Sequence, residues 1–126
     1  MIKINRPIWI ALNMAYMFLL THFSLQGSSG TQEHSAFQQM AYNAIHVPAY
    51  AVFAYLWVCT LGKTNNQTLF WVFFISVSYG ILMEIGQSFI PGREASLSDA
   101  MLNALGAGVV IFIVKRNQVR TMVRVL

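Results

Sequence analysis

The stretch that decides the fold is MEIGQSFIPGREASLSDAMLN, residues 83–103. Two long apolar runs meet there, and three of the four acidic residues of the chain fall inside it. Pro91-Gly92 breaks the pattern near its middle, because neither residue continues a helix readily. The stretch therefore joins two apolar helices and holds most of the acidic residues of a largely apolar chain.

The composition indicates an integral membrane protein. Of the 126 residues, 56% are hydrophobic and only 10% are charged, and the mean hydropathy is +0.54. Soluble domains carry about 25% charged residues, and a chain this small cannot hide so much apolar surface from water. The net charge of +4 does not indicate nucleic-acid binding, because most positive residues stand at the ends of apolar runs.

The apolar runs and their breaks predict an all-α fold of four membrane-spanning helices. A helix needs about 20 apolar residues to cross the hydrocarbon layer. The predicted spans are 7–23, 40–61, 69–90 and 97–114, in one domain over residues 1–126. Pro48 lies inside the second span and predicts a kink or a freed carbonyl there. We also expect a short interfacial helix that begins near Glu33.

The positive residues predict the orientation of this four-helix bundle. With four spans, seven of the eight Lys and Arg residues fall on one side of the membrane, and only Arg93 falls on the other. Cytoplasmic loops carry an excess of Lys and Arg. We therefore expect both termini in the cytoplasm, with the short loop over residues 91–98 facing outward.

This topology brings polar residues of three spans to one depth below the outer surface. Within each span their spacing places them on one face. They are Glu84 with Gln87, Asp99 with Asn103, and Asn43 with His46 and Tyr50. An ionisable group in hydrocarbon costs about 2.5–3.5 kcal/mol on insertion scales, and it turns inward to find a partner.

One interpretation of this cluster is purely structural: its polar contacts only hold the helices together. Asp99 would then cap the last span, and Arg93 would pair with Glu84 or Glu94. Interhelical polar contacts are worth only about 0.6–2 kcal/mol each. Stability alone explains poorly why so many polar residues are placed together, so we favour a functional site.

The order of these residues resembles the signature of the VanZ-like membrane proteins. The matching motifs are Glu84-x-x-Gln87, Phe89-x-Pro91-Gly92-Arg93, Ser96-x-x-Asp99-x-x-x-Asn103-x-x-Gly106-Ala107, and the upstream Asn43-x-x-His46-x-x-x-Tyr50. The family pattern often has Asp where this chain has Asn43. The resemblance implies a small, multi-pass protein of the bacterial cytoplasmic membrane. It also implies a link to the cell envelope, since the name-giving member is associated with resistance to teicoplanin.

Our first hypothesis is that the cluster binds an anionic lipid or a lipid-linked cell-wall precursor. Arg93 would clamp a phosphate, and Ser96 at the start of the last span would offer N–H groups to the same anion. The remaining ligand-binding residues would be Asn43, Tyr50, Gln87 and Asn103. Membrane lipids are thus the expected partners, and no nucleic acid is expected.

Two other hypotheses stay open. The protein would be a membrane-embedded enzyme if Glu84 and His46 act as acid and base with Asp99 orienting them. The same three residues suit a divalent metal, but no short ligand motif such as H-E-x-x-H is present, so we assign no metal ligand and no cofactor. Alternatively, a stripe of small residues in the last span would form a homo-oligomer contact in a non-catalytic assembly factor; the stripe is Ala100, Ala104 and Gly108.

Overall fold

The computed structural model describes residues 5–26, 43–91, 93 and 95–125, with side chains as far as residue 118. These residues contain no strand, which confirms the all-α prediction. The four helices are α1 (Arg6–Ser24), α3 (His46–Leu61), α4 (Asn66–Gln87) and α5 (Leu97–Val125).

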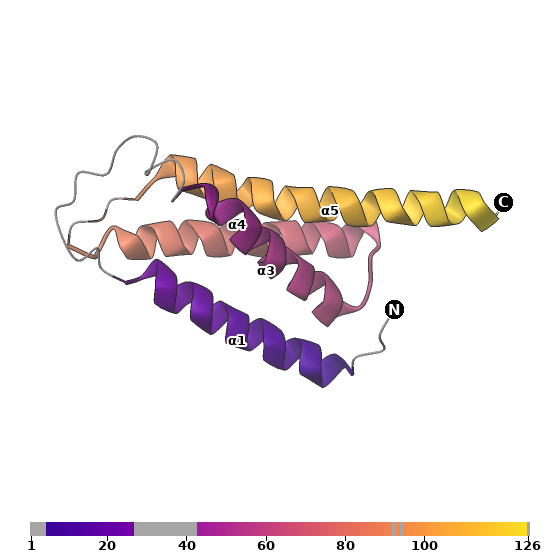
Figure 1. The fold of residues 1–126 in the computed structure, drawn as a ribbon, viewed down its shortest axis with the longest axis horizontal. Helices are drawn as coiled ribbons and strands as arrows, with labels where there is room; N and C mark the ends of the chain where they lie inside the picture. Colours follow the sequence, from indigo (N-terminus) through magenta and orange to yellow (C-terminus); the bar gives the residue numbers. More distant parts are fainter. Residues whose placement is uncertain (1–4, 27–42, 92, 94, 126) are drawn as a thin grey trace.

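The helices run in alternating directions, as Figure 1 shows. The ends of α1 and α4 therefore lie at the same end of the bundle as the starts of α3 and α5, while the start of α1 and the end of α5 lie at the other. α3 packs most extensively against α5 and also contacts α1 and α4. α1 approaches α4 only slightly and does not approach α5. α3 is thus the central helix of the described structure.

The interior is small and lies between α3, α4 and α5. Its fully or nearly fully buried apolar side chains are Phe53, Ala54, Val58, Leu69, Val72 and Ala107. Many large apolar side chains instead point outward, including Phe18, Phe74 and Phe112. This outward display is expected when lipid rather than water surrounds the helices.

A glycine allows α3 and α5 to meet closely. A Cβ atom at Gly106 would overlap the carbonyl oxygen of Val47 and lie 3.0 Å from the amide nitrogen of Ala51. Small residues let helix backbones approach in this way inside a membrane. The predicted stripe of small residues on α5 is only half-buried, because the face that packs carries Asn103, Gly106 and Ala107. A homo-oligomer contact through that stripe stays a prediction.

Two helices are long and apolar enough to cross a membrane. Among the described residues these are Asn66–Gln87 and Leu97–Gln118, whereas α3 is apolar but only 16 residues long. Membrane crossing by α1 and α3, and the cytoplasmic placement of both termini, stay predictions.

The helix bounds differ from the predicted spans at both ends of α4 and at the end of α5. α4 begins at Asn66 rather than residue 69, because the Asn65 side chain accepts a hydrogen bond from the Thr68 amide at 2.8 Å and caps the helix. It ends at Gln87, after which 3₁₀-type bonds lead the chain to Pro91. α5 continues well past residue 114, since nothing between Val114 and Val125 breaks a helix.

The start of the second span also differs. α3 begins at His46 after a turn at Ile45, so Pro48 occupies its first turn rather than a helix interior. A proline there lacks only an N–H that would have bonded the carbonyl of Ala44. The helix is therefore interrupted at Ile45, just before His46, rather than kinked at Pro48. Residues 40–42 of the predicted span, and the interfacial helix expected from Glu33, lie outside the described residues.

Candidate functional site

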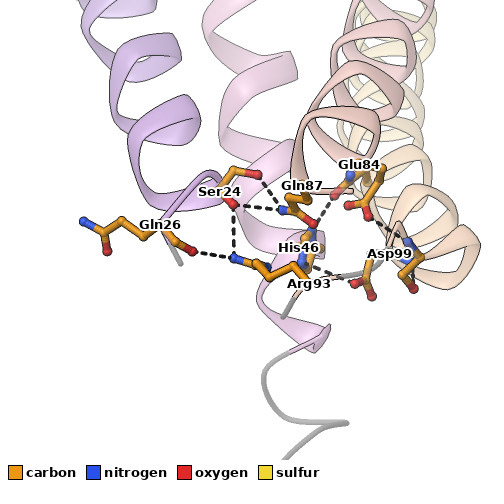
Figure 2. A network of polar contacts seen from close by, with 9 residues as sticks. Ser24, Gln26, His46, Glu84, Gln87, Arg93 and Asp99 are labelled. Atoms are coloured by element: carbon orange, nitrogen blue, oxygen red, sulfur yellow. Dashed lines mark hydrogen bonds and ion pairs between the residues drawn. The ribbon is translucent and has the colours of Figure 1, made fainter. Parts of the chain in front are cut away.

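Three chemically active side chains meet at the end of the bundle near the α4–α5 loop. His46 is the first residue of α3, Glu84 lies in the last turn of α4, and Asp99 lies in the first turn of α5. One nitrogen or oxygen atom of each lies within 4.8 Å of the other two. Figure 2 shows the three side chains facing one another from separate helices. The structure thus brings together the three residues that we predicted to be neighbours, while their roles stay predictions.

The imidazole of His46 is held by α5. Its Nδ1 lies 2.8 Å from Oδ1 of Asn103, which is 1% exposed. Since an amide oxygen only accepts, the Nδ1–H group donates a hydrogen bond to Asn103. This leaves Nε2 facing Asp99, 4.0 Å from Oδ2. Asn103 therefore sets both the orientation and the tautomer of the ring.

The Glu84 carboxylate is buried and only half-satisfied. The residue is 4% exposed, and its Oε2 accepts a hydrogen bond of 3.0 Å from the amide of Ser96. Its Oε1 is buried and has no partner within the described part of the chain. The same holds for Oδ1 of Asp99 and Nδ2 of Asn103. Buried polar atoms without partners are rare in folded proteins and ask for an explanation.

The start of α5 presents Asp99 to the other two side chains. The Ser96 hydroxyl oxygen accepts a hydrogen bond of 3.2 Å from the Asp99 amide, and the Ser96 carbonyl accepts one of 3.1 Å from Ala100. Ser96 is therefore the N-cap and Asp99 the third residue of the helix. The interpretation of Asp99 as the cap is wrong, and its carboxylate faces His46 instead.

Gln87 and Arg93 hold the end of α1. The Gln87 amide donates to the carbonyl and the hydroxyl of Ser24, at 3.1 and 2.7 Å. Nη1 of Arg93 donates to the carbonyls of Ser24 and Gln26, at 3.1 and 3.0 Å. A cation at the C-terminal end of a helix also interacts favourably with the helix dipole. These bonds fix α1 against the loop after α4.

The predicted ion pair between Arg93 and Glu84 is therefore wrong. The guanidinium has turned to the carbonyls of α1, and within the described residues the one ion pair found joins His46 to Asp99. Glu94, the other predicted partner of Arg93, lies outside the described residues.

Two further predicted residues lie at the edge of this arrangement. Tyr50 is buried, one turn along α3 from His46. Asn43 is half-buried and precedes the turn at Ile45; among the described residues no hydrogen bond joins it to the cluster. Neither side chain completes the group formed by His46, Glu84 and Asp99.

Sequence reasoning missed Ser24 and Gly80. A Cβ atom at Gly80 would lie 3.0 Å from Asn103 and 3.3 Å from the Tyr50 ring. Gly80 thus makes room on α4 for the amide that holds His46. The only signal was a glycine inside an apolar run, which often marks close helix approach. Ser24 carried no signal, because its partners come from residues 87 and 93.

The charges of the cluster are unbalanced. The nearest oxygens of the two carboxylates are no more than 4.8 Å apart, and at an effective dielectric constant of about 20 two ionised carboxylates at that distance repel by roughly 3 kcal/mol. Arg93 pairs with neither of them. The arrangement therefore calls for a positive partner or a proton donor that approaches both carboxylates.

The helices and the cluster together define a class of protein: an all-α membrane protein with a polar site where its apolar helices end. A model of the VanZ/LLP1 family matches residues 5–120, and the chain belongs to this family. The predicted VanZ-like membership is thereby confirmed. A search of curated proteins and a search of solved structures each found no match.

Proposed function

We propose that this protein binds the polar headgroup of an anionic lipid or a lipid-linked cell-envelope precursor. The site is the His46–Glu84–Asp99 cluster, facing the outer leaflet of the bacterial cytoplasmic membrane. The observation that carries the proposal is a group of three buried polar atoms without partners, out of six such atoms among the described residues: Glu84 Oε1, Asp99 Oδ1 and Asn103 Nδ2. Two acceptors and one donor match the hydroxyl, ammonium and phosphate groups of a headgroup.

Apolar surface beside the cluster supports an amphiphilic ligand. Phe89 is 82% exposed, and Leu97 is 78% exposed, although both stand next to the polar loop. Met101 and Ile45, which neighbour Asp99 and His46 in the chain, are also exposed. Apolar side chains grouped around a polar site suit a ligand with an acyl chain and a polar head.

The phosphate of such a headgroup would lie on the Arg93 side of the cluster. In Figure 2, Arg93 and His46 lie at the same end of the bundle. Its Nη1 is engaged by α1, so we expect it to contribute mainly charge rather than the two-pronged clamp that the sequence suggested. The amide of Ser96 is likewise engaged, by Glu84. Because two carboxylates repel a bare phosphate, the headgroup would need hydroxyl or cationic groups for Glu84 and Asp99.

Native mass spectrometry in detergent tests this proposal. The probes are phosphatidylglycerol and undecaprenyl phosphate, with neutral phosphatidylcholine as the reference lipid. We expect adducts of an anionic lipid on the wild-type chain and at least tenfold fewer on the variants Glu84→Gln and Asp99→Asn. Ser88→Ala is the matched control, because that exposed hydroxyl only bonds its own helix. Equal adducts on wild type and both cluster variants would contradict the proposal.

One observation favours a second candidate, a membrane-embedded enzyme. The His46 ring is held by Asn103 with its other nitrogen 4.0 Å from Asp99, which is how a general acid or base is oriented. Turnover of lipid-linked cell-wall precursors, lowered at least a hundredfold by Glu84→Gln, would establish this function. If the wild-type chain shows no turnover above background, the enzyme hypothesis is rejected and only the binding hypothesis stays.

Family membership suggests a biological setting for the proposed function. Its name-giving member is associated with teicoplanin resistance, and we propose the same setting for this chain. Expression in a teicoplanin-sensitive bacterium should raise the inhibitory concentration of teicoplanin, and Asp99→Asn should abolish the rise. If the wild-type chain leaves the inhibitory concentration of teicoplanin unchanged, the proposed link to glycopeptide resistance is wrong.

A further inference from the structure

We infer that His46, Glu84 and Asp99 form a binding site for one divalent transition-metal ion. The inference goes beyond headgroup binding and does not depend on it, because it rests on the geometry of the three side chains alone. It also differs from the expectation drawn from the sequence, in which no metal ligand was assigned because no short ligand motif is present.

The His46 ring is prepared as a ligand. Its Nδ1–H is used by Asn103, so in the neutral ring the lone pair is on Nε2. That nitrogen faces the carboxylate of Asp99. Metal-binding histidines commonly donate their other ring N–H to an oxygen of the protein, which fixes the tautomer.

The carboxylates of Glu84 and Asp99 each have one oxygen without a hydrogen-bond partner among the described residues. Glu84 is only 4% exposed. Its Oε2 accepts a hydrogen bond from Ser96, and its Oε1 has no partner among the described residues. Oδ1 of Asp99 is likewise buried and unpartnered. A cation between these oxygens would satisfy both and balance their charge. An ion pair between His46 and Asp99 alone accounts for neither atom.

The distances fit a metal after small movements. Protein ligands lie about 2.0–2.2 Å from Zn²⁺, so two of them around one tetrahedral ion are roughly 3.3–3.6 Å apart. The Nε2 to Oδ2 distance is 4.0 Å, and all three ligand atoms lie within 4.8 Å. To coordinate one ion, the ligand atoms would need to approach one another by up to about 1.5 Å. Three protein ligands would also leave a coordination position open, as in catalytic zinc sites.

The ligand set selects the kind of metal. Mg²⁺ and Ca²⁺ prefer oxygen ligands, whereas an imidazole suits Zn²⁺ and its neighbours in the first transition series. An open position on such an ion would accept an anionic oxygen, including that of a phosphate headgroup. The site would thereby supply the positive charge that Arg93, engaged with α1, supplies only in part.

Titration calorimetry with Zn²⁺ alone tests the inference. The full chain is purified in detergent with a tag that lacks histidine, stripped with a chelator, and checked for monodispersity. We expect one Zn²⁺ per wild-type chain, and a loss of affinity of at least a hundredfold in His46→Gln and Asp99→Asn. Asn103→Leu, which removes the positioning partner of His46, should lose about 10–100-fold. The matched control is His22→Gln, because His22 is exposed on α1 and bonds only Gln26 among the described residues.

Each outcome decides the inference. One equivalent of Zn²⁺ that the cluster variants lose and His22→Gln keeps would establish the site. A wild-type chain that binds Zn²⁺ no better than Asp99→Asn would overturn it, and so would loss of binding in His22→Gln. The visible spectrum of the Co²⁺-loaded wild-type chain gives a check that needs no variant, since an all-water Co²⁺ spectrum would also overturn it. Because no lipid is present, failure here is separate from failure of headgroup binding.

Discussion

The contact between Gly106 and the backbone of α3 offers the sharpest test of how the fold builds the site. In Gly106→Ala the new Cβ would overlap the Val47 carbonyl oxygen and lie 3.0 Å from the Ala51 amide nitrogen. Ordinary contacts between heavy atoms are about 3.5–4.0 Å, so relieving the second contact alone separates the helices by roughly 0.5–1 Å. Both contacting atoms belong to a helix backbone, so no side chain can turn away to relieve the overlap.

The same separation reaches the site. Asn103 lies one turn before Gly106 on α5, and His46 lies next to Val47 on α3. The bond of 2.8 Å between His46 and Asn103 would stretch beyond about 3.2 Å, where N–H···O bonds weaken steeply. Overpacking costs about 1–3 kcal/mol, and the lost bond adds about 0.5–1.5 kcal/mol. We therefore expect a loss of roughly 2–4 kcal/mol in the free energy of unfolding.

Thermal unfolding in detergent and Zn²⁺ titration measure both effects. Gly108→Ala is the matched control, because a Cβ there would meet only a Phe73 ring atom at 3.9 Å. We expect the melting temperature of Gly106→Ala to fall by at least about 5 °C, and that of Gly108→Ala to change by less than about 2 °C. A Gly106→Ala chain as stable as Gly108→Ala would refute the close approach of α3 and α5.

Two further predictions concern α1 and the orientation of the chain. Gln87→Leu keeps the size of the side chain but removes two hydrogen bonds to Ser24, whose carbonyl keeps only Arg93 as a donor. At about 0.5–1.5 kcal/mol for each bond, thermal unfolding should show a loss of about 1–3 kcal/mol. Ser88→Ala should change stability by less than about 0.5 kcal/mol, and equal losses would contradict the role of Gln87. In a Cys59→Ser background, a membrane-impermeant maleimide should label Ala95→Cys in intact cells and Gln67→Cys only after permeabilisation. Both positions are exposed, with Gln67 in the first turn of α4 and Ala95 in the loop between α4 and α5. The reverse pattern would overturn the orientation with both termini in the cytoplasm.

Much of the fold was open to prediction from residue types alone. Apolar runs of sufficient length, broken at Gly62 and Pro91-Gly92, predicted helices that the structure confirms at α1, α3, α4 and α5. Ser96, which was expected at the start of the last helix, caps that helix. Helix bounds were less certain, since a side-chain cap at Asn65 and a turn at Ile45 move them by several residues.

The sequence also placed His46, Glu84 and Asp99 at one end of the bundle. Alternating helix directions require this, whatever the packing, because the three residues lie at ends that must adjoin. Spacing further put Asn103 on the same face of α5 as Asp99, which is where it holds His46. Periodicity along a single helix was enough for each of these inferences.

Only the tertiary structure decided which polar groups pair. Arg93 was expected to meet a carboxylate or a phosphate, yet it bonds carbonyls of α1, and Gln87 bonds the same turn of α1 rather than the cluster. Those partners lie more than sixty residues away in the chain. A helix pattern states which way a residue faces but not how far a neighbouring helix has been rotated or shifted against it. That rotation depends on contacts such as the one at Gly106, where the backbones of α3 and α5 approach closely.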